Sequence, residues 1–404
     1  MSIMDAAEAV QTLLSPSATH DPVPAYAALR KHGPVLPVAD GYYFVSGYAA
    51  VDGILRDPAM ETYDIKRLDV RWDDWRDNKA LELFADSMLR SNPPDHTRMR
   101  RLAAGVFTAR RTGALRSVIE AQVGEALDRL DGEADLMSSL AYPLPIGVIT
   151  ALLGVPAADR GRFRRLAEAL TAVLEVRWTE RDEARAHEAA IELEDYFVHL
   201  IARKQAEPAD DLVSALTRDG EKLTGRELLG NLMLLLVAGF ETTTNLLGNG
   251  VVLLLDHPAY AERLRADPGL APAYVEEILR FDSPVQLTER FAARPTRMHG
   301  IELPAEAELV LLLGAANRDP DRFERAGDFW PERPGNTPLS FGAGAHYCLG
   351  APLARLEAQI ALPALLRRFP EMRLTRRPVR RPRMNLRGWE TLPVTLGTPR
   401  DSVD

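Results

Sequence analysis

Hydrophobic residues recur every three to four positions through most of the middle of the chain, which is the period of an amphipathic helix. This spacing predicts helices over residues 115–130, 145–153, 160–174 and 180–204. A nearly apolar run over 228–255 predicts a longer helix. Its centre, residues 241–245, is polar and would be costly in the middle of a bilayer, so we expect a buried core helix and not a membrane span.

The N-terminal part shows the shorter periods of strands. Residues 35–38 and 42–45 alternate around Asp40-Gly41, which predicts a hairpin. Short helices are expected around it, over 21–33 and 48–55, and further strands over 285–292, 299–303 and 309–313.

Residues 62–91 show no clear period, carry many charges and contain Trp72 and Trp75. Long loops in compact domains are often functional, so we expect this segment to cover a substrate, with plain surface packing as the alternative.

Composition narrows the class of protein. The chain has 404 residues, 46% of them hydrophobic, and a net charge of −9, which excludes disorder and argues against a nucleic-acid partner. A single cysteine excludes an intramolecular disulfide. The N-terminus has early acidic residues and no basic segment before an apolar core, so we expect a cytoplasmic protein without a signal peptide or membrane anchor.

That cysteine, Cys348, lies in a loop that also contains Gly342, Gly344 and Gly350. Helical spacing resumes directly after it, which predicts that Cys348 lies at a helix N-terminus, where a thiolate is favoured over a thiol. A thiolate in a glycine-rich loop is one way to ligate haem iron through sulfur. The alternative is that Cys348 is a small buried hydrophobic residue.

The stretch from Phe341 to Glu357 resembles the haem-binding loop of the cytochrome P450 superfamily, F-G-x-G-x-H-x-C-x-G-x-x-L-A-R-x-E, at every defined position. The chain is similar to the soluble bacterial class, in particular to actinobacterial secondary-metabolite hydroxylases. The resemblance implies a mainly α fold, a large helical bundle around haem b with small β-sheets. It implies one domain over residues 1–404, with a β-rich part at about 30–60 and a helical core at about 93–368.

Two basic side chains, His96 and Arg100, are one helical turn apart and could grip one anionic group. Taken alone, the pattern also fits a solvated basic face. The resemblance implies that both hold a haem propionate, as does Arg290. It leaves His346 as the propionate donor of the cysteine loop, because Pro338 stands where the family often has histidine.

An acid and an alcohol, Glu241 and Thr242, stand side by side in the long helix, which makes them a candidate proton relay. Threonines in mid-helix can instead bond back to the preceding turn. The stretch from Ala238 to Thr243 resembles the family's A-G-x-E-T-T pattern, which implies that the pair delivers protons to dioxygen. The resemblance also implies a mainly apolar substrate pocket lined by Leu234, Val237, Ala238, Val285, Gln286, Leu287 and Trp389. It further implies that the connection over 175–181, with Trp178, is the mobile lid over the substrate channel.

The expected activity is therefore that of a haem-thiolate monooxygenase that hydroxylates or epoxidises a hydrophobic small molecule. The resemblance implies O₂ as co-substrate and a ferredoxin with its reductase as electron donors, and we expect a monomer. We expect the ferredoxin at Arg101, Arg110, Arg111 and Arg355 by charge complementarity. The alternatives are a haem-thiolate peroxygenase or isomerase, a non-catalytic haem sensor, and a cysteine-nucleophile hydrolase or transferase.

Overall fold

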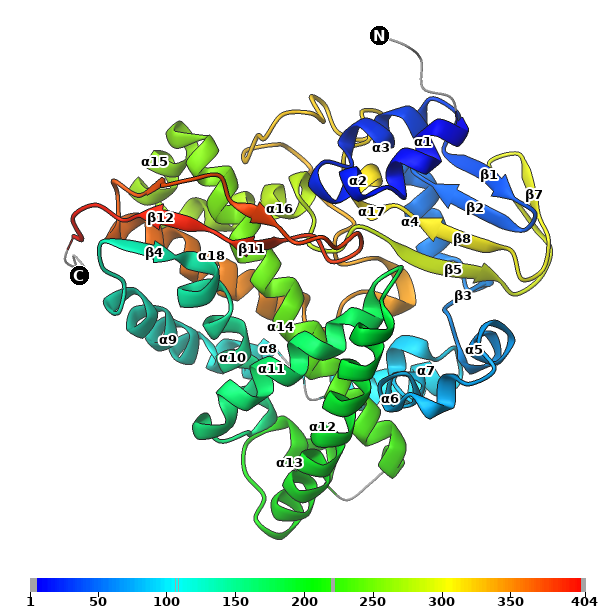
Figure 1. Cartoon of the computed structure of the whole chain (residues 1–404), viewed down its shortest axis with the longest axis horizontal. Helices are drawn as coiled ribbons and strands as arrows, with labels where there is room; N and C mark the ends of the chain where they lie inside the picture. The colour runs from blue at the N-terminus through cyan, green and yellow to red at the C-terminus, as the bar shows by residue number, and fades with distance from the viewer. Residues whose placement is uncertain (1–5, 106, 108, 219–221, 401–404) are drawn as a thin grey trace. The chain divides into compact units, whose positions relative to one another are not determined.

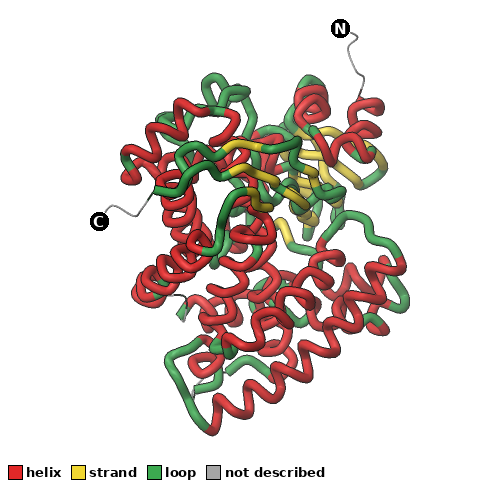
Figure 2. The backbone as a smooth tube through the Cα atoms, turned by 60° about the vertical axis from the view of Figure 1, so that its left-hand side comes forward, coloured by secondary structure: helices red, strands yellow, loops and turns green. Residues whose placement is uncertain are grey.

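The structure, a computed structural model, describes residues 6–105, 107, 109–218 and 222–400. It is mainly helical with small sheets, as Figure 2 shows, and this confirms the predicted fold class. The chain divides into two compact units. Unit 1 comprises residues 1–62, 245–348 and 366–404, and unit 2 comprises residues 63–244 and 349–365.

Unit 1 is built on a five-stranded sheet with the order β1-β2-β8-β5-β3 (Figure 1). Its strands are β1 (Val35–Ala39), β2 (Tyr42–Val45), β3 (Met60–Glu61), β5 (Thr288–Ala292) and β8 (Glu308–Leu311). The predicted hairpin is confirmed, because β1 pairs antiparallel with β2 and Val35 lies opposite Val45. β2 and β8 are parallel, and the other neighbours are antiparallel.

The two faces of this sheet carry different hydrophobic clusters, as the period of two along a strand requires. Phe44 and Val310 pack with Tyr26 and Leu29 of the N-terminal helices. The residues next to them in the strands, such as Val45 and Leu309, pack on the other face. The hydrophobic cluster on that face includes Leu339 and Ala343. One face of the sheet therefore supports the segment that leads to Cys348.

Unit 1 also contains nine complete helical elements among its described residues. They are α1 (Ala6–Leu13), α2 (Pro16–His20), α3 (Val23–Arg30), α4 (Tyr48–Arg56), α15 (Pro258–Ala266), η6 (Pro268–Leu270), α16 (Ala271–Phe281), α17 (Leu313–Ala316) and η7 (Gly344–His346). The remaining strands are short: β6 (Thr296–Met298), β7 (Ile301–Leu303), β9 (Arg373–Leu374), β10 (Val379–Arg380), β11 (Trp389–Thr391) and β12 (Pro393–Thr395).

A buried ion pair joins α16 to the proline-rich segment that follows α17. Glu277 and Arg280 are both fully buried, and their side chains lie 2.7 Å apart. Arg280 also donates to the carbonyls of Asn317 and Ala326. Removal of one partner from such a pair is strongly destabilising, so these residues support the fold.

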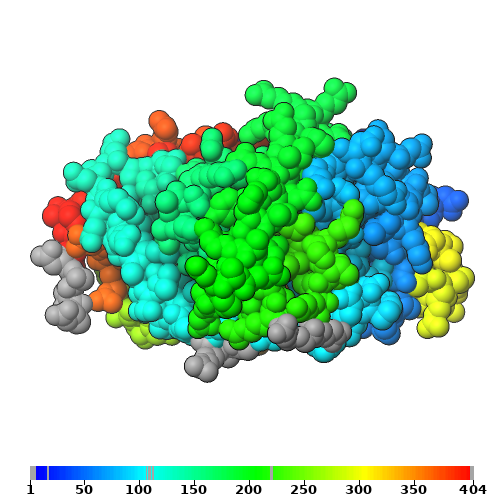
Figure 3. All heavy atoms as spheres, turned by 90° about the horizontal axis from the view of Figure 1, so that it is seen from below, coloured from blue at the N-terminus to red at the C-terminus, as the bar shows by residue number. Residues whose placement is uncertain are grey.

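Unit 2 is almost entirely helical. Its elements are α5 (Ile65–Arg71), η1 (Trp75–Asp77), α6 (Lys79–Ala85), η2 (Met88–Arg90), α7 (Asp95–Ala104), α8 (Ala109–Ala114), α9 (Arg116–Asp128), β4 (Glu133–Asp135), η3 (Met137–Ala141), α10 (Pro143–Leu153), η4 (Ala157–Asp159), α11 (Arg160–Leu170), η5 (Thr171–Leu174), α12 (Glu180–Ala206), α13 (Leu212–Leu216) and most of α18 (Ala351–Arg368). The long helix α14 (Gly225–Asp256) belongs to it as far as Thr244. Residues of α9 to α13 cover the middle of the face in Figure 3, in cyan to green. No helix among the described residues is both long and apolar enough to cross a membrane.

The expectation of an irregular segment over 62–91 is wrong. This segment contains α5 and α6, and each begins at a side-chain cap. Asp64 accepts a hydrogen bond from the backbone N–H of Arg67, and Asn78 accepts from Ala80 and Leu81. Such caps satisfy amides that the first helical turn leaves unpaired, which lets short and highly charged segments form helices.

A charged network fixes the N-terminal helices to the rest of unit 1. Asp282 accepts hydrogen bonds from Arg380 at 2.6 Å and from Arg387 at 2.7 Å. The remaining donors of Arg387 bond to the carbonyls of Thr19 and His20. Burial opposes the ionisation of Asp282, but the two arginines outweigh burial and lower its pKa to about 2.

This pKa predicts how stability depends on pH. The ordinary pKa is 3.8, so ionised Asp282 contributes about 2.5 kcal/mol above pH 4, and this contribution is lost as the pH falls through 2. We expect Asp282→Asn to lower the free energy of unfolding by about 3 kcal/mol at pH 7, because two arginines lose their buried partner. Urea unfolding between pH 8 and pH 3 should show the difference shrinking below pH 4. Asp256→Asn, at an exposed acid, serves as the control, and a pH-independent difference would contradict this account.

Candidate functional site

The loop before Cys348 is held in a tight conformation in unit 1. The backbone N–H of Cys348 donates to the carbonyl of Phe341 at 2.9 Å, and that of Gly342 donates to Leu339 at 2.8 Å. Gly344 has a φ of +66°, and a Cβ there would lie 2.1 Å from the carbonyl oxygen of Leu55. Only glycine fits this position, which explains why the loop needs it.

Cys348 forms no disulfide among the described residues and is half-buried. The prediction that Cys348 lies at a helix N-terminus needs a correction, because α18 begins only at Ala351. The bond from its N–H to Phe341, and not helical geometry, fixes its backbone. The sulfur therefore lies in a preformed loop, partly accessible, as a metal-ligating thiolate requires.

A buried cation on β5 has no counter-charge within the described residues. Arg290 is buried, donates to the carbonyl of Glu289 at 2.7 Å, and makes no ion pair among them. Burial lowers its pKa to about 10, so the side chain is still charged at pH 7. Because an unpaired buried charge is costly, Arg290 fits a bound anionic group such as a haem propionate. His346, in η7, is half-buried.

In unit 2, α7 carries the predicted pair of basic residues. His96 is buried and Arg100 is partly buried. Both lie on this one helix, one turn apart, so their side chains leave the same face. The structure therefore does not present them as a fully solvated basic face.

The centre of α14 has one accessible face. Every residue over 232–244 is buried except Ala238, Gly239 and Thr242. Thr242 Oγ1 donates to the carbonyl of Ala238 at 2.7 Å, and Glu241 beside it is buried. A Cβ on Gly239 would lie 2.9 Å from the side chain of Ile149, so this glycine allows α10 to pack closely. A partly accessible hydroxyl next to a buried acid is an arrangement suited to proton transfer.

The residues expected to line a substrate pocket differ in accessibility. On α14, Ala238 is exposed, whereas Leu234 and Val237 are buried. In unit 1, Val285 is half-buried and forms an isolated antiparallel bridge with Leu386.

The other three residues make interior contacts in unit 1. Gln286 accepts a hydrogen bond from the Tyr26 hydroxyl at 2.7 Å and donates to the carbonyl of Ser283. Leu287 packs in the cluster of the N-terminal helices. The ring of Trp389 lies under the guanidinium of Arg380, with 3.5 Å between Cζ and the ring centroid. Their contact with substrate stays a prediction.

Two tryptophans from the expected covering segments meet in unit 2. The ring centroids of Trp72 and Trp178 are 5.7 Å apart, and Tyr63 lies 6.2 Å from Trp72. Trp72 and Trp178 also line a small apolar cavity of about 20 Å³, together with Phe84. The sequence indicates both segments as candidate covering segments. It does not predict that their tryptophans are in contact, because the two residues are far apart in the chain.

One residue of the motif had no role assigned from sequence. Glu357, on α18, is buried, and its Oε2 has no hydrogen-bond partner among the described residues. Burial raises its pKa well above the usual range, so this carboxyl carries a proton at higher pH than an exposed glutamate. Its only signal in the sequence was its position at the end of the motif.

Comparison with known proteins agrees with this geometry. The sequence model of the family described as Cytochrome P450 matches residues 149–268 and 269–391. The chain is 41% identical over 403 residues to Cytochrome P450 monooxygenase PikC of Streptomyces venezuelae, covering 95% of this chain and 92% of that protein. It is 40% identical over 346 residues to Polyketide biosynthesis cytochrome P450 PksS of Bacillus subtilis strain 168, covering 83% and 82%. Among solved structures, P450BioI in complex with hexadec-9Z-enoic acid ligated acyl carrier protein superposes with a TM-score of 0.89 at 35% identity, covering 94% and 100%.

Proposed function

Because the chain belongs to the cytochrome P450 superfamily, as a monooxygenase that binds haem b through a cysteine thiolate, we propose that it hydroxylates or epoxidises a hydrophobic small molecule of secondary metabolism. Its electrons would come from a ferredoxin and its reductase. The observation that carries this proposal is the half-buried Cys348 in a loop that matches the family motif throughout. The names of PksS and PikC support the substrate class and the reaction.

Five residues of the chain would hold the cofactor. Cys348 would ligate the iron, and Arg290, with His346, His96 and Arg100, would pair with the propionates. The unpaired buried charge of Arg290 supports this assignment. Bound haem supplies the activation of O₂ and the transfer of one oxygen atom to the substrate, while the other atom leaves as water with two electrons and two protons.

The protons would pass through α14. Among the described residues, Thr242 Oγ1 bonds only to the Ala238 carbonyl, and it lies on the one accessible face of this helix segment. Its hydroxyl can rotate to donate a proton, and Glu241 would restore that proton from the protein side. The exposed Ala238 on the same face would present an apolar surface to a hydrophobic substrate.

A substrate screen tests the proposed reaction directly. We expect hydrophobic polyketides or terpenoids from a compound library to shift the Soret band of the ferric enzyme, and the compounds that bind to be oxidised when a ferredoxin, its reductase and NADPH are supplied. A family of binders that are never turned over by any electron donor would favour the sensor. Turnover with hydrogen peroxide alone would favour the peroxygenase.

The ferredoxin is expected on a basic surface of unit 2. Arg101 is exposed, whereas Arg111 pairs with Asp210 at 3.0 Å. The side chain of Arg110 lies outside the described residues, and Arg355 is half-buried. Arg101 is exposed, whereas the Arg111 side chain is only 23% exposed, so Arg101 should contribute more to docking.

Neutralisation of this surface should weaken ferredoxin binding most at low salt. We expect Arg101→Gln to weaken it by about tenfold at low ionic strength and less at high ionic strength, and Arg111→Gln to have a smaller effect. Binding titrations at two salt concentrations measure both, with Arg294→Gln, at an exposed arginine of unit 1, as the control. Equal losses at both salt concentrations would point to a different docking surface.

A cytoplasmic location and a monomeric state of this protein also remain predictions.

A further inference from the structure

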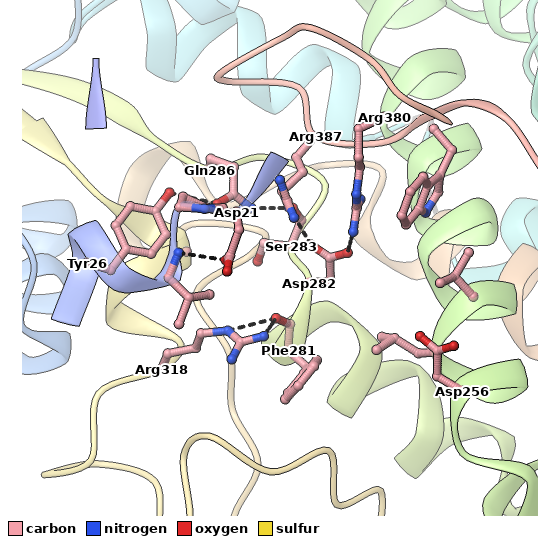
Figure 4. Close-up of a pocket in the computed structure, with 16 residues that line it drawn as sticks. Asp21, Tyr26, Asp256, Phe281, Asp282, Ser283, Gln286, Arg318, Arg380 and Arg387 are labelled. Atoms are coloured by element: carbon pink, nitrogen blue, oxygen red, sulfur yellow. Dashed lines mark hydrogen bonds and ion pairs between the residues drawn. The ribbon is translucent and has the colours of Figure 1, made fainter. Parts of the chain in front are cut away.

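Unit 1 contains a cavity of about 240 Å³ that is lined in part by two residues expected at the substrate pocket, Gln286 and Trp389, but by none of the residues proposed to hold haem or move protons. Figure 4 shows its polar side chains, which come from α3 and the residues just before it, the end of α14, the segments after α16 and after α17, and the β10–β11 hairpin. Its volume lies just below the range of about 300–1,000 Å³ typical of drug-sized ligands. An occupant would therefore be a small organic molecule.

Three arginines and three aspartates line this cavity, and only one of the aspartates is buried. Its walls include three guanidinium groups, those of Arg318, Arg380 and Arg387, and one buried carboxylate, Asp282. Asp282 is engaged by Arg380 and Arg387 at 2.6 and 2.7 Å. The third guanidinium, on Arg318, donates no hydrogen bond to this carboxylate and interacts with it only through space.

Arg318 keeps one side open for a ligand. Its Nε and Nη2 donate to the carbonyl of Phe281 at 3.0 and 2.6 Å, and its Cζ lies 3.9 Å from the centroid of the Phe281 ring. Its Nη1 donates to no atom of the described residues, and the side chain makes no ion pair among them. Burial lowers its pKa to about 10, so the group stays charged at pH 7.

The remaining walls restrict the kind of anion. Val252, Leu253 and Phe281 give the cavity an apolar side. Two exposed carboxylates, Asp21 and Asp256, also line it and would repel a multiply charged anion such as phosphate. The indole Nε1–H of Trp389, a buried wall residue, donates to no described atom and offers a second donor.

We propose that this cavity is a binding site for a small amphipathic monocarboxylate, whose carboxylate pairs with Arg318 and whose apolar body lies against Val252, Leu253 and Phe281. A charge-assisted pair with a partly buried arginine supplies the specificity. The apolar wall supplies affinity through burial. Because the site joins α3 to α14, its occupant stabilises unit 1.

Benzoate, with benzamide as its neutral analogue, tests this site on the haem-loaded enzyme by isothermal titration calorimetry. We expect one benzoate to bind per chain and benzamide to bind at least about tenfold more weakly. Saturating benzoate should raise the thermal midpoint by a few degrees and leave the Soret band unchanged.

Two variants and one control complete the test. Arg318→Gln should weaken benzoate by about tenfold. Val23→Phe, which fills the cavity from α3 and removes no charge, should abolish binding, and Arg294→Gln should have no effect. Equal affinity for benzoate and benzamide, a Soret shift caused by benzoate, or undiminished binding in the folded Arg318→Gln and Val23→Phe variants would each overturn the proposal.

Discussion

Substitution of Cys348 by serine is expected to abolish oxygenation and the red-shifted Soret band of the reduced CO complex. The thiolate supplies electron density that favours cleavage of the O–O bond, and a serine hydroxyl is too weak an acid to replace it. Cys348→His should also lose both properties, even where imidazole still ligates the metal. Absorption spectra and product analysis of the two variants measure the effect.

Two controls separate loss of the sulfur ligand from loss of the fold. Circular dichroism should show the same helical content in Cys348→Ser as in the wild type, because the loop is fixed by backbone bonds from Cys348 and Gly342. Since Cys348 is the chain's single cysteine, a thiol reagent reports on this atom alone. It should label the haem-free protein and spare the haem-loaded one. Retention of oxygenation and of the shifted band in Cys348→Ser would end the thiolate assignment.

Hydrophobic periodicity alone predicts the two longest helices. Residues 180–204 were expected to form one helix, and α12 spans Glu180–Ala206. Residues 228–255 were expected to form another, and α14 spans Gly225–Asp256. Both carry a strong period or a continuous apolar run, which local sequence reveals directly.

Hydrophobic periodicity does not predict secondary structure where single polar contacts determine it. The caps at Asp64 and Asn78 turn a highly charged segment into helices that periodicity did not indicate. The motif identifies the loop that contains Cys348. It does not reveal that the backbone of Cys348 is fixed by a hydrogen bond from its N–H to the carbonyl of Phe341, and not by a helix N-terminus.

Contacts between residues far apart in the chain are not predicted by the sequence, for a different reason. Asp282 and Arg387 are separated by 105 positions, and no local pattern relates them. The same holds for Trp72 and Trp178, which the sequence marked separately. Such pairs depend on how the chain folds back on itself, so one sequence without relatives does not contain them.

Among these predictions, the role of Thr242 is the one that separates oxygen activation from mere haem binding. Its hydroxyl lies on the accessible face of α14 and bonds back to the Ala238 carbonyl at 2.7 Å. That bond contributes little to the helix, because alanine has the higher helix propensity. Any effect of its removal on catalysis would therefore reflect the hydroxyl and not a loss of stability.

Thr242→Ala is expected to lower the yield of product per NADPH by at least about tenfold, because proton delivery contributes a factor of this size or more. The electrons would then leave as hydrogen peroxide, which a peroxidase assay measures beside product and NADPH consumption. Thr242→Ser, which keeps the hydroxyl, should restore much of the yield. Thr244→Val is the matched control on the same helix, because the Thr244 hydroxyl is buried without a described partner. An unchanged product yield in Thr242→Ala would remove this residue from the relay and leave Glu241 to act through another group.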